Sequence, residues 1–302
     1  MINFQKVQPS DREAFNAILK AGSPRGCEYS FANLCLWGRQ EIAFIHGCIA
    51  IFAHFEGRSV YGYPIGPGDR RAVIQDMLQD AKNRGIPCRI GSLTESDREE
   101  LSEWFPEEFY LAADRDGQDY VYDINDLADL KGRKFQRKRN HLNRFKAVNP
   151  DYTVEPLTKD NMEQAKLLVH HWYAWHREQG MGDYLLEQVA MDRAFRHYDA
   201  LGMDGLLLKL NGETVAFTIG SFLTEDTVDV HFEKAREDVD GAYAAINSEF
   251  ARYLREKYPS LLYLDREDDM GLEGLRKAKL SYNPHHMIEK YRAYPKEDVD
   301  DT

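Results

Sequence analysis

Three polar side chains alternate with apolar ones in the second half of the chain. Asp229, His231 and Glu233 occupy every second position, and the residues between them are apolar. Side chains two residues apart share one face of a β-strand, so the pattern predicts a strand with a titratable face. A carboxylate or an imidazole on that face can act as a general base that removes a proton from a nucleophile. Glu233 is the first candidate for that base and His231 the second; the alternative is an ordinary strand whose polar side faces solvent.

A second group of ionisable residues follows the next predicted strand. Four carboxylates stand close together there: Asp265, Glu267, Asp268 and Asp269. Open α/β sheets bind ligands at strand ends, so this group, with Asp265 first in it, can hold a cationic ligand group such as an amine. Their spacing is weak evidence for Mg²⁺, and no metal site is predicted. Further along, we expect Lys279 to contact donor phosphates and Tyr282 to donate a proton to a leaving oxygen or thiolate, with core packing as the alternative for Tyr282.

The strongest departure from the background of the chain is the basic run KGRKFQRKRNHLNRFK at residues 131–146. It holds eight Lys or Arg residues and no Asp or Glu, within a chain of 39 basic and 51 acidic residues. A local basic cluster in an acidic protein predicts a docking site for one polyanion. The sequence pI near 5.4 argues against general coating of DNA, so no DNA partner is expected.

Written as a helix, the basic run has two different sides. Phe135 and Leu142 fall on one side. The opposite side carries three arginines: Arg133, Arg137 and Arg144. Guanidinium groups bind phosphate oxygens bidentately, whereas Lys134 beside them offers a point charge, so this face predicts contacts with donor phosphates. The alternative is a helix held against acidic domains by ion pairs within the protein.

Length and composition indicate a globular protein of two domains. The chain has 302 residues, 43% of them hydrophobic, which suffices for two cores. We expect an N-terminal lobe at 1–126, a basic linker helix at 127–149, a C-terminal lobe at 150–295 and an acidic tail at 296–302.

The four cysteines lack C-x-x-C spacing, which favours buried thiols over disulfides or zinc ligands. No segment resembles a signal peptide or a membrane span, so a cytoplasmic protein is expected.

The same order of predicted elements occurs twice. Each half begins with a short strand and a helix, continues with β-rich runs joined by a glycine turn, and then has a helix, a proline and a short strand. The helices after the β-rich runs are predicted at 69–84 and 243–257, and the strands that follow them at 88–93 and 261–264. This repetition predicts a duplicated mixed α/β domain, connected by the basic run.

A mixed sheet in which a glycine turn after the fourth strand enters a helix is similar to the acyl-CoA N-acyltransferase (GNAT) domain. The stretch LDREDDMGLEGLRKAKLSYNP at 264–284, the following HHMIEKYRAYP and the linking segment at 130–148 resemble the C-terminal domain of phosphatidylglycerol lysyltransferases. That family is similar to the FemABX-type tandem GNAT transferases. The resemblance covers nearly the whole chain and implies an α/β (α+β) fold of two tandem GNAT-like lobes, each a mixed, mostly antiparallel sheet flanked by helices.

Members of that family with known activity move an aminoacyl group from aminoacyl-tRNA to a lipid or a cell-wall precursor. The resemblance therefore implies an acyltransferase with a tRNA-linked donor and a small-molecule or cell-envelope precursor as amine or hydroxyl acceptor. A lipid acceptor is not expected, because no part of this sequence looks membrane-embedded. Two alternatives stay open: an acyl-CoA-dependent N-acyltransferase, and a non-catalytic module that binds RNA or another anion.

Two loops bear on the donor, because GNAT enzymes that use acyl-CoA carry Gln/Arg-x-x-Gly-x-Gly/Ala around its pyrophosphate. The first lobe keeps Gly66 and Gly68 but lacks the leading Gln or Arg, and the proline between them removes an N–H donor. The second lobe reads Asp238-Val-Asp-Gly241, which puts carboxylates where a diphosphate would bind. Arg236 offsets them in part, so Arg236 and Gly241 stay candidates for phosphate binding. Acyl-CoA ranks below an RNA-linked donor and is the one cofactor considered.

Overall fold

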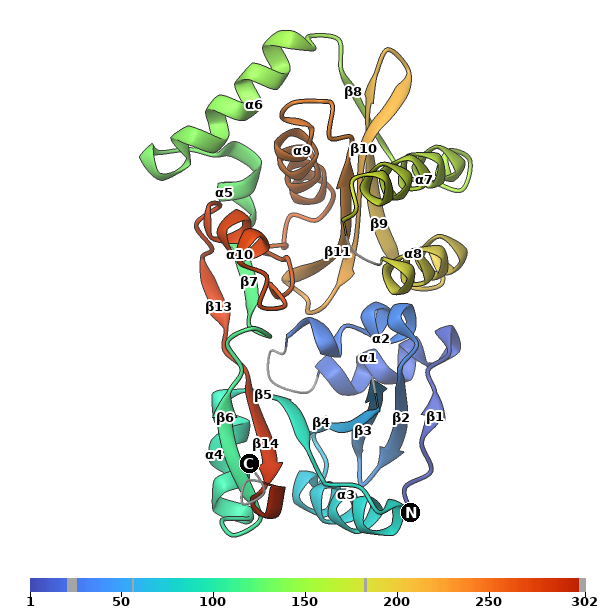
Figure 1. The fold of residues 1–302 in the computed structure, drawn as a ribbon, viewed down its shortest axis with the longest axis vertical. Coiled ribbons are helices and arrows are strands. Elements are labelled where there is room, and N and C mark those ends of the chain that lie inside the picture. The colour runs from blue at the N-terminus through green and yellow to red at the C-terminus, as the bar shows by residue number, and fades with distance from the viewer. Residues whose placement is uncertain (21–25, 56, 182–183, 299–302) are drawn as a thin grey trace. The chain divides into compact units, whose positions relative to one another are not determined.

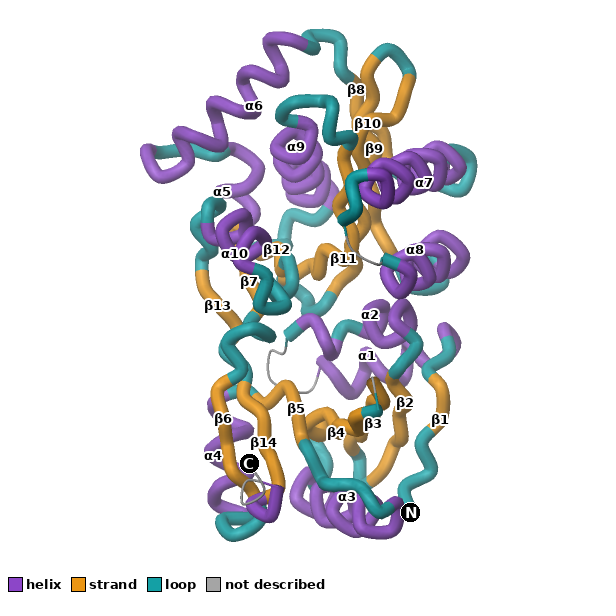
Figure 2. The backbone as a smooth tube through the Cα atoms, viewed as in Figure 1, coloured by secondary structure: helices purple, strands orange, loops and turns teal. Residues whose placement is uncertain are grey.

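The structure is a computed structural model that describes residues 1–20, 26–55, 57–181 and 184–298. The chain forms two compact units. Unit 1 comprises Met1–Asp119, Asp268–Gly271 and Met287–Thr302, and unit 2 comprises Tyr120–Glu267 and Leu272–His286. Each unit is built around one seven-stranded mixed sheet with helices against its faces (Figures 1 and 2). The predicted α/β class, with two mixed sheets flanked by helices, is confirmed.

Unit 1 contains four helices and seven strands among its described residues. In chain order they are β1 (Gln5–Lys6), α1 (Arg12–Lys20), α2 (Phe31–Trp37), β2 (Gln40–Ile45), β3 (Cys48–Phe55), β4 (Arg58–Ile65), α3 (Arg70–Arg84), β5 (Ile90–Leu93), α4 (Glu95–Trp104), β6 (Phe109–Ala113) and β14 (Tyr291–Pro295). The strand order is β1-β2-β3-β4-β5-β14-β6. The core of the sheet packs on α3 through buried residues that include Tyr61, Tyr63, Ile74 and Met77.

Unit 2 has the second sheet, in the order β13-β7-β12-β11-β10-β9-β8. Its elements are β7 (Asp119–Asp123), α5 (Ile124–Asp129), α6 (Gln136–Val148), β8 (Thr153–Pro156), α7 (Met162–Glu178), α8 (Leu185–His197), β9 (Met203–Leu210), β10 (Glu213–Phe222), β11 (Thr227–Ala235), α9 (Ala242–Lys257), β12 (Tyr263–Asp265), α10 (Glu273–Leu280) and β13 (His286–Ile288). Helix α9 covers one face of the sheet, and α7 and α8 cover the other (Figure 1).

Local sequence signals explain where several elements end. Asn211 and Gly212 both have positive φ, 50° and 82°, which suits the tight turn between β9 and β10. Asp69 caps α3, because its carboxylate accepts a hydrogen bond from the N–H of Ala72. Gly85 ends the same helix with φ of 66°, a conformation that costs glycine little. Turn and cap residues of this kind made the element order predictable.

The predicted repeat of element order is present, and the last strand of each half is exchanged. Each half runs strand, two helices, three antiparallel strands, helix, strand, helix and two strands. However, β7 from the first half pairs in the second sheet between β12 and β13, and β14 from the second half pairs in the first sheet between β5 and β6. The expected lobes at 1–126 and 150–295 therefore differ from the compact units at these two strands. Strand partners depend on long-range pairing, which local patterns do not report.

The basic run at 131–146 folds as a 3-10 turn (Arg133–Phe135) followed by α6 and belongs to unit 2. Phe135, Leu142 and Phe145 are buried, and the first two of these were predicted to share a side. The side of the helix that holds Phe145 packs on α9. Of the expected acidic tail at 296–302, residues 299–302 lie outside the described part, and Lys296–Asp298 form a short 3-10 turn.

The exchanged strand β14 should be essential for unit 1. Ala293 is fully buried at its centre, so Ala293→Asp would place an unpaired carboxylate in the sheet and should lower the free energy of unfolding by at least about 3 kcal/mol. Urea unfolding measures the loss in free energy of unfolding, and amide hydrogen exchange shows which strands are destabilised. We expect faster exchange in β5 and β6 than in β9 to β11. Arg292→Ala, which changes an exposed residue of the same strand, is the control. If Ala293→Asp speeds hydrogen exchange equally in both sheets, β14 does not belong to the first sheet alone and the exchange of strands is wrong.

Candidate functional site

The three titratable residues predicted to share a strand lie on β11, a central strand of the second sheet. Asp229 and His231 are buried, and the side chain of Glu233 is 9% exposed. The pairing of β10 with β11 shifts register between Ile219 and Gly220, which leaves His231 as the extra residue of a β-bulge. Bulges redirect side chains and occur beside functional sites. Because both faces of β11 are covered, the alternative of a solvent-facing polar strand does not hold.

Glu233 forms a buried ion pair with Arg266. Arg266 Nη2 lies 2.9 Å from Glu233 Oε1, and Asn247 Nδ2 donates to Glu233 Oε2 at 3.3 Å. Burial opposes the charge on Arg266, but the nearby carboxylate outweighs it, so the pKa of the guanidinium lies above its ordinary value. Each carboxylate oxygen of Glu233 thus accepts one hydrogen bond, which fixes the orientation of the group.

Tyr282 lies against the same guanidinium. The Cζ atom of Arg266 is 5.1 Å from the ring centre of Tyr282 and 5.8 Å from that of Tyr122. Burial raises the pKa of Tyr282 to about 12, so its phenol keeps the proton at neutral pH, as a proton donor requires. Tyr122 donates its hydroxyl to the carbonyl of Lys279 at 2.8 Å. Two of the predicted catalytic residues, Glu233 and Tyr282, therefore meet at Arg266.

A basic cavity adjoins this group. Lys138 Nζ lies 4.0 Å from the ring centre of Tyr282. It also lines a cavity of about 280 Å³ whose walls come from α6, α10 and the residue after α10: Arg137, Lys138, His141, Lys277, Ala278 and Ser281. Burial, together with the charges of Arg266 and Arg137, lowers the pKa of Lys138 to about 8. None of these lining residues is acidic, so the cavity suits an anion.

His231 belongs to a second buried group. Its Nε2 lies 2.8 Å from Ser221 Oγ, and its Nδ1 lies 3.3 Å from Asp229 Oδ2 and 3.5 Å from Glu267 Oε1. Asp265 is buried on the neighbouring strand β12, in register with Asp229. The four predicted catalytic residues thus fall into two groups, Glu233 with Tyr282 and His231 near Asp265.

The predicted donor loop after β11 is occupied by contacts within the protein. Arg236 binds Asp238 through two hydrogen bonds of 2.9 and 2.6 Å and Glu213 through one of 2.7 Å. Gly241 has φ of 83°, and a Cβ there would lie 2.9 Å from the Cβ of Phe145 on α6. In this structure Arg236 is therefore held by carboxylates, and Gly241 allows α6 to approach α9.

The remaining predicted donor contacts lie on the basic run and on α10. The three arginines that were predicted to share a side are all exposed: Arg133, Arg137 and Arg144. The first two form no ion pair with any residue that the structure describes, whereas Arg144 Nε lies 3.3 Å from Asp240. Lys134 pairs with Asp126 at 2.8 Å. Lys279 is buried, and its ammonium donates to the carbonyls of Arg266 and Glu267, so it supports the loop that carries them.

A larger cavity of about 430 Å³ lies in unit 2 between α7 and the loop after β11. Its lining is His171, Trp172, Trp175, Glu213, Arg236, Glu237 and Asp238. The ring of Trp172 stacks on His176 with centres 3.5 Å apart, and Lys234 Nζ lies 3.8 Å from the same ring. The rings and charged groups beside this cavity thus contact one another, and Trp175, which also lines it, is partly exposed to solvent.

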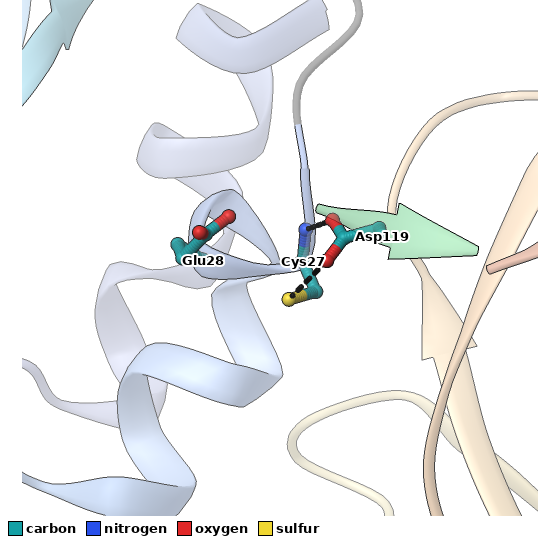
Figure 3. A group of neighbouring side chains, drawn as sticks. All are labelled: Cys27, Glu28 and Asp119. Carbon is teal, nitrogen blue, oxygen red and sulfur yellow. Dashed lines mark hydrogen bonds between the residues drawn. The ribbon is translucent and has the colours of Figure 1, made fainter. Parts of the chain in front are cut away.

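Unit 1 contains a buried ionic cluster around Lys290. Its ammonium lies 2.7 Å from Asp119 Oδ1 and 2.7 Å from Glu28 Oε1. Cys27 donates its N–H and its thiol to Asp119, at 2.8 and 3.3 Å (Figure 3). Burial opposes the charge of Lys290, but Asp119 and the other anionic groups overcome it and hold its pKa well above the usual range. All four cysteines are free thiols; Cys27, Cys48 and Cys88 are buried, as predicted, whereas Cys35 is only partly buried.

Three residues of these groups were not identified from the sequence: Lys138, Ser221 and Arg266. Glu267 was expected only as one member of the acidic group after β12, without its contact to His231. Arg266 is a single cation within the acidic stretch after β12, and that isolation was the available signal. In the sequence, nothing distinguishes Lys138 from the other lysines of the basic run. Ser221 has no sequence signal, because its contact with His231 depends on pairing of β10 with β11.

Two mixed sheets with repeated strand order define the class of proteins with tandem GNAT-like lobes. Residues 20–294 match the family described as phosphatidylglycerol lysyltransferase, C-terminal, and the chain belongs to this family. A conserved protein of unknown function from Bacteroides thetaiotaomicron is 38% identical, with 98% of this chain and 100% of that chain covered and a TM-score of 0.92.

More distant relatives share the fold. L-PGS from Bacillus licheniformis is 17% identical, with 97% of this chain and 93% of that chain covered and a TM-score of 0.70. FemX is 11% identical, with coverage of 99% and 98% and a TM-score of 0.59. An uncharacterized protein of Mycoplasmoides gallisepticum is 26% identical over 177 residues, 57% of this chain and 54% of that protein, so the chain spans about half its length. Among the described residues, no helix is long and apolar enough to cross a membrane.

The pair of Glu233 and Arg266 should be costly to break. Glu233→Gln leaves the guanidinium buried without its counter-charge and should lower the free energy of unfolding by on the order of 3 kcal/mol. Adding Arg266→Met should recover most of the loss. Urea unfolding measures both, and Glu273→Gln, which breaks the exposed pair with Lys277, is the control with an expected change of at most about 0.5 kcal/mol. An equally mild effect of Glu233→Gln would show that the pair carries little energy.

Proposed function

We propose that this protein transfers an aminoacyl group from an activated, tRNA-linked donor to an amine or hydroxyl acceptor. The family and the fold support an acyltransferase of the aminoacyl-transferase kind. The observation that carries the proposal is a continuous series of cationic groups. Lys138 shares the basic cavity with Arg137, and its ammonium lies 4.0 Å from the ring of Tyr282, which in turn lies against Arg266. Donor phosphates at the cavity would bring the acyl ester to Arg266 and Glu233.

The reaction is the displacement of an ester oxygen by the acceptor. Glu233 takes the proton of the acceptor amine or hydroxyl as the new bond to the acyl carbon forms. Arg266 stabilises the negative charge that develops on the carbonyl oxygen. The bond from the acyl carbon to the donor oxygen then breaks, and Tyr282 gives that oxygen a proton. One proton returns through solvent from Glu233 to the tyrosinate, which restores the enzyme.

The arrangement favours a phosphate-rich strand over coenzyme A. In unit 1, a Cβ on Gly68 would lie 1.9 Å from the carbonyl oxygen of His46, so this loop packs on the hairpin turn. The carboxylate of Asp69 already accepts a hydrogen bond at the start of α3. In unit 2, Arg236 is bound by carboxylates. Close packing of Gly68 in the first loop and the ion pairs of Arg236 in the second both disfavour a pyrophosphate at these loops.

The three exposed arginines of the basic run provide a direct test of donor binding. Changing Arg133, Arg137 and Arg144 together to Gln should weaken binding of aminoacyl-tRNA and reduce the slope of log K against log salt by about 0.7 per lost contact with a single strand. These side chains are exposed, so the melting curve should change little. Fluorescence anisotropy over a salt series measures the slope.

A matched control removes three exposed cations elsewhere in unit 2: Lys159→Gln, Arg177→Gln and Arg196→Gln. This variant should keep the salt slope of the unchanged protein. If the first triple variant unfolds while its binding keeps the original slope, the arginines are structural and the donor proposal is wrong. A different outcome is that the Arg133, Arg137 and Arg144 variant loses binding, whereas Glu233→Gln and Tyr282→Phe still transfer the aminoacyl group. The donor site would then be supported, and the catalytic roles assigned to Glu233 and Tyr282 would be wrong.

Acetyl-CoA should bind weakly or not at all, because both glycine loops are packed against neighbouring residues. Isothermal titration calorimetry should show no saturable heat at low micromolar concentration. A thermal-shift series with acetyl-CoA and with aminoacyl-tRNA gives a second reading, since a ligand selective for the folded state raises the melting temperature. Saturable binding of acetyl-CoA in the low micromolar range would favour an acyl-CoA-dependent N-acyltransferase instead.

A further inference from the structure

The buried group around His231 has the dimensions of a metal site. One ligand atom each from Asp229, His231 and Glu267 lies within 4.8 Å of the others. His231 Nδ1 is 3.3 Å from Asp229 Oδ2 and 3.5 Å from Glu267 Oε1. Bonds of about 2.1 Å to a tetrahedral zinc ion put neighbouring ligand atoms about 3.4 Å apart. Both distances from the imidazole nitrogen match that spacing.

The imidazole is oriented as a ligand would be. The side chain of His231 is 2% exposed, and its Nδ1 forms no hydrogen bond with any group in the described part of the chain. The other ring nitrogen, Nε2, lies 2.8 Å from Ser221 Oγ. When Nε2 donates its proton to the serine oxygen, Nδ1 keeps a lone pair that faces two carboxylates. A hydrogen-bond partner on the second nitrogen is the usual support of a metal-bound histidine.

We propose that unit 2 binds one divalent metal ion through Asp229, His231 and Glu267, with Ser221 fixing the imidazole. A set of one nitrogen and two carboxylate oxygens suits Zn²⁺ or Mn²⁺ better than Ca²⁺, which prefers six or more oxygen ligands. The proposed ligands include neither Glu233 nor Arg266. The existence of the site does not depend on the proposed acyl transfer, and metal binding is measured without that activity.

The cluster of Cys27, Glu28 and Asp119 in unit 1 shows why spacing alone does not define such a site. These residues also place three ligand atoms within 4.8 Å (Figure 3). There, however, the ammonium of Lys290 lies 2.7 Å from both carboxylates, so the chain itself supplies the cation. We therefore assign no metal to that cluster, and it serves as an internal reference.

The test is a titration of the full chain, freed of metal by dialysis against EDTA, with zinc chloride. We expect one Zn²⁺ per chain with micromolar or tighter affinity, and a rise in melting temperature at saturation. His231→Gln should weaken binding at least about tenfold, and Ser221→Ala about tenfold, as losses of a ligand and of its support. His170→Gln, an exposed histidine on α7, is the matched control and should bind like the unchanged protein.

Cobalt provides a second measurement on the unchanged protein. Co²⁺ in a site with one nitrogen and two oxygens should give visible absorption that zinc chloride abolishes in equimolar amount. If His231→Gln does not fold, Glu267→Gln, whose side chain is 23% exposed, replaces it and should weaken binding at least about tenfold. Absence of saturable binding by the unchanged protein, or equal affinity in the ligand variants, would overturn the site and leave His231 as a buried histidine in contact with two carboxylates.

Discussion

The buried ion pair of Asp119 and Lys290 holds the points at which the two exchanged strands begin. Asp119 is the first residue of β7, and Lys290 directly precedes β14. Both side chains are almost fully buried, and the carbonyl of Lys290 also accepts the N–H of Asp114. An unpaired charge at either position would cost several kcal/mol, so both strands depend on this contact. Gly26 makes room for it, because a Cβ there would lie 2.5 Å from the Asp119 carboxylate.

The strand that starts at Asp119 also positions the candidate site of unit 2. The N–H of Arg266 donates to the carbonyl of Tyr120 at 3.0 Å, and the N–H of Tyr120 donates to the carbonyl of Glu267 at 3.2 Å. Lys279 holds the same two residues through their carbonyls. The guanidinium that orients Glu233 and the carboxylate that faces His231 are therefore fixed by backbone hydrogen bonds. Side chains placed in this way lose little entropy when a ligand binds.

The basic run combines the two roles that its sequence left open. Part of its charge is used inside unit 2: Lys146 pairs with Glu249, Lys134 with Asp126, and Arg139 donates to carbonyls before the helix. Its apolar side is buried against α9. Exposed cations remain on the other side, and they include Arg137 in the basic cavity. A helix anchored by packing and by some of its own charges presents the rest in a fixed geometry, which is what recognition of phosphates requires.

The sequence by itself determined the features that depend on neighbouring residues. The repeated element order, the two-sided basic helix with Phe135 and Leu142 buried, and the free thiols follow from periodicity, turn residues and cysteine spacing. The tertiary structure alone decided which strands were exchanged, that Arg266 is the partner of Glu233, and that a bulge sets His231 beside Ser221 and Glu267. The side-chain contacts among them join residues that are between 10 and 36 positions apart in the sequence. Their energies come from long-range strand pairing and burial of charge, which no local pattern encodes.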